Sequence, residues 1–236
     1  MLMDPLYLAI LVGTLVLSGA VSLLVRNRFS AGQRVPLLTG MSGRDVAYAV
    51  LSAYGIRNVD VVEHAGFLSD HYNPLTRTLA LSPAVYHGRD AAAAGVAAHE
   101  VGHAVQHASA YAPLWMRSAI VPAANLGSSL GPWIVIAGLL LGVGSALGHG
   151  LAVLGLALFG ASTLFTLVTV PVEFDASRRA KQALRSLGIV RSSREVAAVN
   201  GVLDAAGLTY VAAAASSLAM LFYWATRAGL LGSSRS

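Results

Sequence analysis

Four long apolar stretches constrain how this chain can fold more than any other feature of its sequence. A helix needs about 20 mostly apolar residues to cross the hydrocarbon core of a bilayer. Four segments meet this requirement, namely residues 5–25, 131–147, 151–170 and 208–230. Only 11% of the 236 residues are charged, whereas soluble domains contain about 25% charged residues. We therefore expect a mainly α-helical membrane protein with about four transmembrane helices.

Basic residues cluster in the two polar regions that separate these apolar stretches. All but two of the 16 Lys and Arg residues lie between the first and second stretches or between the third and fourth; the exceptions are Arg227 and Arg235. Because positively charged loops stay in the cytoplasm, we expect both polar regions to be cytoplasmic and the short turn at 148–150 to face outside. This topology also explains the net charge of +5 without a nucleic-acid partner.

The first apolar stretch predicts a retained membrane anchor. Asp4 leaves it no basic segment at its start, and no Ala-x-Ala cleavage site follows it. A secretory signal peptide has both features and an apolar region of at most about 15 residues. We therefore expect a multi-pass protein of the cell membrane.

The pattern of apolar and polar stretches divides the chain into five predicted segments. One of them, at 26–118, is a small α+β domain on the cytoplasmic side. The other four segments are a transmembrane helix at 1–25, a transmembrane hairpin at 131–172, a cytoplasmic helical segment at 173–204 and a fourth transmembrane helix at 205–231. The stretch at 111–129, which overlaps the end of the α+β domain, contains two prolines and is expected to lie along the membrane surface.

Local signals within the α+β domain predict two strands followed by a long helix. The strands are expected at 58–64 and 76–82, and the residues at 70–74 between them favour a turn. An extended peptide could bind by adding to the edge of the strand at 76–82. Asp90 is suited to cap a helix that runs on to about Ala110.

This long helix contains the sequence His99-Glu100-Val101-Gly102-His103. Positions four apart project from one face of a helix, so the two imidazoles can bind one zinc ion with bonds of about 2.0–2.1 Å. Glu100 is offset around the helix and can take a proton from a water on the metal. The chain has no cysteine, which restricts the ligands to His, Asp and Glu. The motif therefore predicts one zinc ion, with Glu100 as the catalytic base.

A third ligand is needed, and the sequence offers His107 and Glu173. His107 is eight residues beyond His99, a rise of about 12 Å along a helix, which is too far for one tetrahedral ion. Glu173 follows the third apolar stretch, so two membrane crossings return it to the side of the histidines. We expect Glu173 to be the ligand, although an acidic residue at a helix start also explains it.

Four further residues are candidates for supporting a ligand or stabilising the oxyanion of the reaction. They are His107, Asp175, Arg178 and Tyr210. Arg178 can also pair with Asp175 or anchor its helix at the lipid headgroups, and Tyr210 can serve as an interfacial aromatic.

The residues around the motif resemble the YugP-type neutral zinc metallopeptidases of bacterial membranes. The similar stretches are 68–74, 97–107, 171–177 and 208–214. The chain is more distantly similar to the HtpX-type and CAAX prenyl-protease gluzincins, in which the glutamate of a Glu-Phe-x-Ala-Asp helix completes the zinc site. That similarity implies a zincin-like catalytic domain and a ligand role for Glu173. The chain departs from the distant pattern because Ser177 stands in place of its aspartate, and the nearest acid is Asp175.

These observations favour a zinc metalloendopeptidase that cleaves membrane or membrane-proximal proteins at the cytoplasmic surface. A zinc-dependent hydrolase of a non-peptide ester or amide is an alternative. A zinc transporter or sensor is a third possibility, but it would require ionisable residues inside the spans, and the two middle spans at 131–147 and 151–170 have none. Glu100 also argues for hydrolysis, since a site that only binds zinc needs no base. The sequence indicates no oligomeric state.

Overall fold

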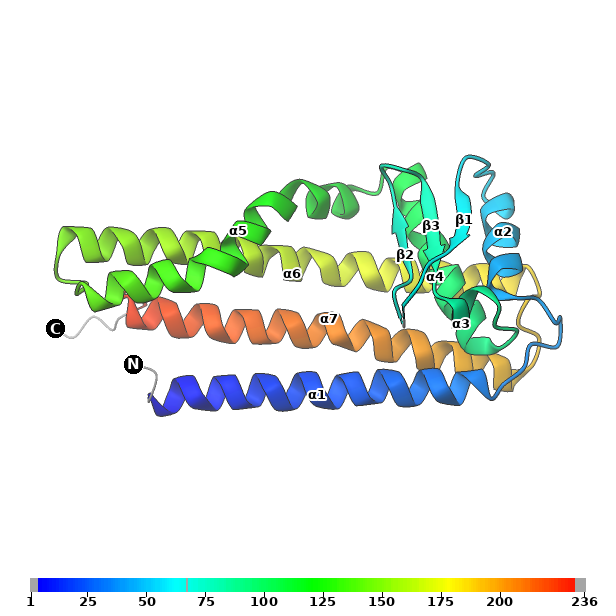
Figure 1. Ribbon diagram of the computed structural model, residues 1–236, viewed down its shortest axis with the longest axis horizontal. Helices are drawn as coiled ribbons and strands as arrows, with labels where there is room; N and C mark the ends of the chain where they lie inside the picture. The colour runs from blue at the N-terminus through cyan, green and yellow to red at the C-terminus, as the bar shows by residue number, and fades with distance from the viewer. Residues whose placement is uncertain (1–3, 67, 232–236) are drawn as a thin grey trace. The chain divides into compact units, whose positions relative to one another are not determined.

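The computed structural model describes residues 4–66 and 68–231, so Arg235 lies outside the described residues. Within these residues the chain forms seven helices and three short strands (Figure 1). In chain order they are α1 (Pro5–Gln33), α2 (Gly43–Ala53), β1 (Asp60–Glu63), β2 (His71–Asn73), β3 (Thr78–Leu81), α3 (Pro83–Tyr86), α4 (Ala91–Ala108), α5 (Ala112–Leu140), α6 (Ala146–Ser186) and α7 (Ser193–Arg227).

Four of these helices, α1, α5, α6 and α7, are long and apolar enough to cross a membrane. This confirms the prediction of a mainly helical protein with four apolar helices and a small α+β part. Most of the stretch at 111–129 forms the first part of α5, which begins at Ala112 and includes Pro122 and Pro132, and its place along the membrane surface stays a prediction. Prolines are tolerated inside membrane helices, where neighbouring groups satisfy the backbone that they free.

The predicted turn at 148–150 is wrong. Residues 148–150 belong to the start of α6, and the chain reverses between the end of α5 at Leu140 and Ala146. Gly142 has a φ of 84°, the left-handed conformation that commonly ends a helix and that glycine adopts without strain. The sequence contains several glycines in this region, and only the backbone conformation distinguishes the one that ends α5.

The chain divides into two compact units. The first consists of residues 1–19, 115–170 and 210–236, and within it Asp4 makes an ion pair of 2.9 Å with Arg227. Tyr223 also donates a hydrogen bond of 3.3 Å to Asp4. Arg227 was one of the two basic residues that did not fit the predicted topology, and this pairing balances its charge.

The second unit consists of residues 20–114 and 171–209 and contains the mixed sheet. The strand order is β1-β3-β2, with β3 parallel to β1 and antiparallel to β2. The predicted strands at 58–64 and 76–82 are confirmed as β1 and β3. However, the residues at 70–74 are not only a turn, because His71–Asn73 form β2. Since β3 has a partner on both sides, the suggestion that a peptide could add to the edge of β3 is wrong.

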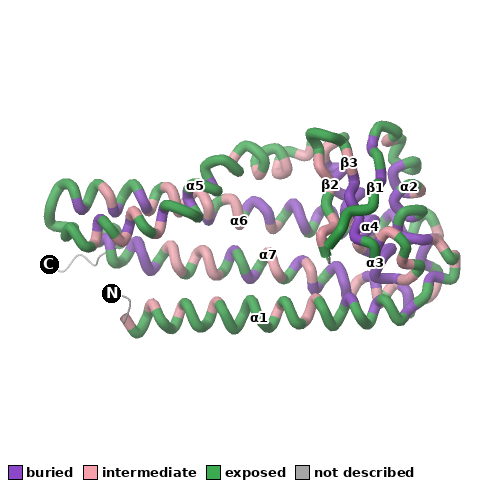
Figure 2. Tube along the Cα trace, viewed as in Figure 1, coloured by how far each residue is buried: buried purple, intermediate pink, exposed green. Residues whose placement is uncertain are grey.

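Helix α4 is the centre of the second unit. The sheet and α2 both pack against it, and it is buried along most of its length (Figures 1 and 2). Its first turns contain only small apolar residues from Ala91 to Ala98, apart from Val96, and small side chains allow neighbouring elements to approach closely. The motif therefore lies on a helix that the rest of the unit holds in place.

Candidate metal centre

The start of α4 sets the position of the histidines along the helix. Asp90 is extended, with φ −134° and ψ 169°, and its carboxylate accepts a hydrogen bond of 2.9 Å from the amide of Ala93. This confirms the predicted cap. From this start, His99, Glu100 and His103 fall at and just beyond the middle of α4, where Glu100 and His103 are each only 9% exposed.

His99, His103 and Glu173 form a group whose donor atoms all lie within 4.8 Å of one another. The Oε2 atom of Glu173 is 3.2 Å from Nε2 of His99 and 3.5 Å from Nε2 of His103. Ligand atoms of a tetrahedral zinc ion with bonds of about 2.0–2.1 Å are about 3.3 Å apart. The two distances bracket this value, so the three residues fit one zinc ion. Glu173 itself is almost fully buried.

A close approach between α4 and α6 brings these residues together. A Cβ atom at Gly102 would lie 2.7 Å from the carbonyl oxygen of Ala176 on α6, which is shorter than real contacts of this kind. Only glycine therefore permits this spacing of the two helices. Glu173 and Ser177 are close to Ala176 in α6, so the contact at Gly102 presents both to α4. No local signal in the sequence marks Gly102 as more than a variable position of the motif.

The outer ring nitrogens of both histidines have hydrogen-bond partners. Nδ1 of His99 is 3.1 Å from the hydroxyl of Ser177, and Nδ1 of His103 is 3.0 Å from Oε1 of Gln106. In metal sites such partners fix the tautomer and the orientation of the imidazole. Neither partner was predicted from the sequence. Ser177 was considered only as a departure from the distant pattern, although its place in that pattern was a usable signal.

The electrostatic surroundings of His103 favour its charged form when no metal is bound. Burial by itself lowers the pKa of His103, but the hydrogen bond with Glu173 and the charges of Glu100 and Glu173 raise this pKa above its ordinary value overall. A metal binds the neutral imidazole, so these surroundings make metal binding compete with protonation of His103.

Glu100 lies next to this group without being part of it. Among residues 4–66 and 68–231, no hydrogen bond or ion pair engages the Glu100 carboxylate. A carboxylate that must accept a proton during catalysis has to be available in this way. The position of Glu100, one residue after His99 on α4, is the one expected for a base beside the metal.

The other candidate residues have different environments. Nδ1 of His107 is 3.0 Å from the hydroxyl of Tyr72 on β2, and His107 is not a member of the donor group. Asp175 is buried and pairs with Arg178 and, at 2.6 Å, with Arg179. Tyr210 belongs to the first unit, so its role in the reaction stays a prediction.

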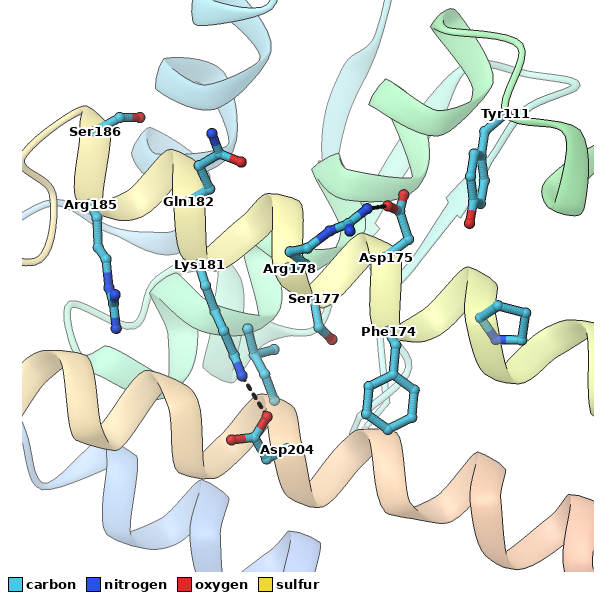
Figure 3. A pocket seen from close by; sticks show the side chains of 12 residues that line it. Tyr111, Phe174, Asp175, Ser177, Arg178, Lys181, Gln182, Arg185, Ser186 and Asp204 are labelled. Carbon is cyan, nitrogen blue, oxygen red and sulfur yellow. Dashed lines mark hydrogen bonds and ion pairs between the residues drawn. The ribbon is translucent and has the colours of Figure 1, made fainter.

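A cavity of about 890 Å³ lies along the part of α6 that follows Pro171. Figure 3 shows that Lys181 points toward Asp204 of α7 and that Arg178 reaches toward Asp175. Asp175 and Ser177 line this cavity, and Ser177 also contacts His99. The cavity therefore lies beside the candidate metal centre.

Two histidines four residues apart, with a glutamate from a second helix, are the donor set of the glutamate-type zinc metallopeptidases. Comparison with known proteins agrees with this class. The family model described as "Putative neutral zinc metallopeptidase" matches residues 7–229, and the chain belongs to this family. The resemblance seen in the sequence is thus confirmed.

One curated relative covers most of the chain. It is described as "Putative membrane protease YugP" of Bacillus subtilis (strain 168) and is 41% identical over 213 residues, which are 90% of this chain and 92% of the relative. No solved structure matches the chain.

Proposed function

We propose that this protein is a membrane-embedded zinc metalloendopeptidase that hydrolyses peptide bonds of membrane or membrane-proximal proteins. The observation that carries the proposal is the convergence of His99, His103 and Glu173 beside Glu100. Membership of a zinc metallopeptidase family, a relative described as a membrane protease and four helices able to cross a membrane support it.

In this proposal, Nε2 of His99, Nε2 of His103 and Oε2 of Glu173 hold one zinc ion. When bound, zinc supplies a Lewis acid that polarises the substrate carbonyl and lowers the pKa of a water to about 7. The Glu100 carboxylate accepts the proton of the attacking water and then gives it to the nitrogen of the leaving amine. Ser177 keeps the His99 ring oriented through its hydroxyl.

Hydrolysis explains the site better than zinc transport or sensing. A site that only binds zinc gains nothing from a buried carboxylate that is hydrogen-bonded to neither histidine, and Glu100 is such a group among the described residues. A transporter would also need ionisable groups along its membrane helices. The apolar part of α6 that precedes Pro171 has no charged residue.

Removal of the metal tests the proposed activity. Treating the purified full-length protein with a zinc chelator should abolish hydrolysis of unfolded protein substrates, and one equivalent of zinc should restore it, because three protein donors suit a single ion. Fragments separated by mass spectrometry report the cleavage. Hydrolysis that continues at full rate in the metal-free protein would refute the proposal, and cleavage of esters but no peptides would favour the non-peptide hydrolase.

We further propose that the second unit, with the active site, faces the cytoplasm of the cell and that the α5–α6 turn lies outside. The concentration of basic residues in the second unit supports this orientation. Because the chain contains no cysteine, single cysteines can report it. Leu75 is 93% exposed in the loop before β3, and Gly144 lies in open space in the α5–α6 turn.

An impermeant thiol reagent should label Gly144→Cys in intact cells and should label Leu75→Cys only after the cells are permeabilised. Permeabilised cells also serve as the control that both thiols can react. The reverse pattern, with Leu75→Cys labelled in intact cells and Gly144→Cys protected, would mean that the protein is inserted the other way round.

A further inference from the structure

A chain of buried polar groups leads from His103 to the ion pairs of α6. Oε1 of Gln106 is 3.0 Å from Nδ1 of His103. The Nε2 atom of Gln106 is 2.8 Å from the carbonyl oxygen of Val172 and 3.0 Å from Oδ2 of Asp175. Gln106 is fully buried and Asp175 is nearly so. A buried amide with all its hydrogen bonds made is held firmly, because leaving any of them unmade is costly.

The partners of Gln106 fix the direction of its amide. The carbonyl oxygen of Val172 and the carboxylate of Asp175 can only accept hydrogen bonds, so the group that faces them must be the NH₂ of Gln106. Its Oε1 atom must then face His103. Since Oε1 can only accept, Nδ1 of His103 must carry the hydrogen and donate it. When the His103 ring is neutral, as metal binding requires, its lone pair is therefore on Nε2, the nitrogen that lies 3.5 Å from Glu173.

Asp175 is the group that keeps Gln106 in this orientation. Its carboxylate accepts hydrogen bonds from Arg178, from Nε of Arg179 at 2.6 Å and from Gln106. The guanidinium of Arg179 also lies over the ring of Tyr111, 5.7 Å from its centroid. The two arginines hold the carboxylate and Tyr111 restricts Arg179, so Asp175 is fixed where it can accept from Gln106.

We infer that Gln106 and Asp175 are positioning residues for the second histidine of the metal centre. Asp175 orients the Gln106 amide, and Gln106 selects the tautomer of His103 that directs Nε2 at the metal. This inference rests on the proposed zinc site and adds to it. It also assigns a role to Asp175, the acid whose place in the sequence departs from the distant gluzincin pattern. Here Ser177 supports the first histidine, and Asp175 supports the second through an intervening amide.

Zinc affinity tests the inference without any measurement of activity. Outer partners of metal-bound histidines typically contribute about 10–100-fold to metal affinity. We expect Gln106→Leu to weaken zinc binding by about this factor when the purified full-length protein competes with a chelator for the metal. Asp175→Asn should also weaken it. If Asp175 acts through Gln106, the double variant should bind zinc no more weakly than Gln106→Leu alone.

A control variant separates positioning from a general loss of structure. Glu195→Gln alters another buried acid of the second unit, one that accepts a hydrogen bond of 2.8 Å from the amide of Leu38, and it should leave zinc affinity unchanged.

The possible outcomes distinguish this inference from the proposed function. Zinc affinity of Gln106→Leu equal to that of the unchanged protein would overturn the inference, and so would fully additive losses in the double variant. If the unchanged protein itself bound no zinc, the proposed metalloendopeptidase would fail first.

Discussion

Glu100→Gln is expected to abolish hydrolysis while zinc stays bound. Glutamine has nearly the shape of glutamate but cannot accept the proton of the attacking water. His99, His103 and Glu173 are unchanged in this variant, so the metal site keeps its three donors. Loss of a general base typically costs about 10²–10⁴-fold in rate. The measurements are kcat/KM on a protein substrate and the zinc content of the purified variant.

Glu63→Gln is the matched control for this experiment. Glu63 is an exposed acid in the same unit and pairs with His87 at 3.2 Å, so its replacement should change neither rate nor zinc content. Glu100→Gln with normal turnover would show that another group is the base. Loss of zinc from Glu100→Gln would instead mean that Glu100 holds the metal.

Glu173→Ala is expected to remove zinc and activity together, whereas His107→Ala should keep the metal. Glu173 contributes one of the three donor atoms that lie within 4.8 Å of one another, and its loss leaves two histidines that cannot retain zinc at low concentration. His107 is outside this group and contacts Tyr72 instead. The affinity loss in Glu173→Ala should exceed the 10–100-fold typical of outer partners.

Zinc content of the two purified variants, measured side by side, decides between these ligands. Glu173→Gln is a useful third variant, because it keeps the volume of the buried side chain and so separates ligand loss from cavity formation. Zinc lost from His107→Ala but kept in Glu173→Ala would make the predicted ligand set wrong.

The sequence predicts the parts of this protein whose signals are local. Asp90 caps α4 as predicted, because this cap depends on a few neighbouring residues. The strand β2 was missed because His71–Asn73 are too few to show a periodic pattern, and pairing with β3 supplies their order. The end of α5 was misplaced because several glycines nearby suit a turn equally well.

The arrangement around the histidines could be predicted only in part. Counting membrane crossings was enough to suggest that Glu173 returns to the side of the histidines. The contacts of Ser177 and Gln106 could not be predicted from the sequence, because they depend on how α4 and α6 are aligned along each other. That alignment is set by the contact between Gly102 and Ala176, two positions far apart in the chain that no local pattern connects.

The order in which the donor residues are synthesised has a consequence for the cell. His99 and Glu173 are 74 residues apart, and the whole α5–α6 hairpin lies between them. A ribosome that has completed α5 has produced both histidines and Glu100 but not yet the residue that completes the donor group. The nascent chain therefore cannot assemble its proposed metal centre before the third apolar stretch has been made, and a truncated chain that ends in that hairpin would lack the third donor.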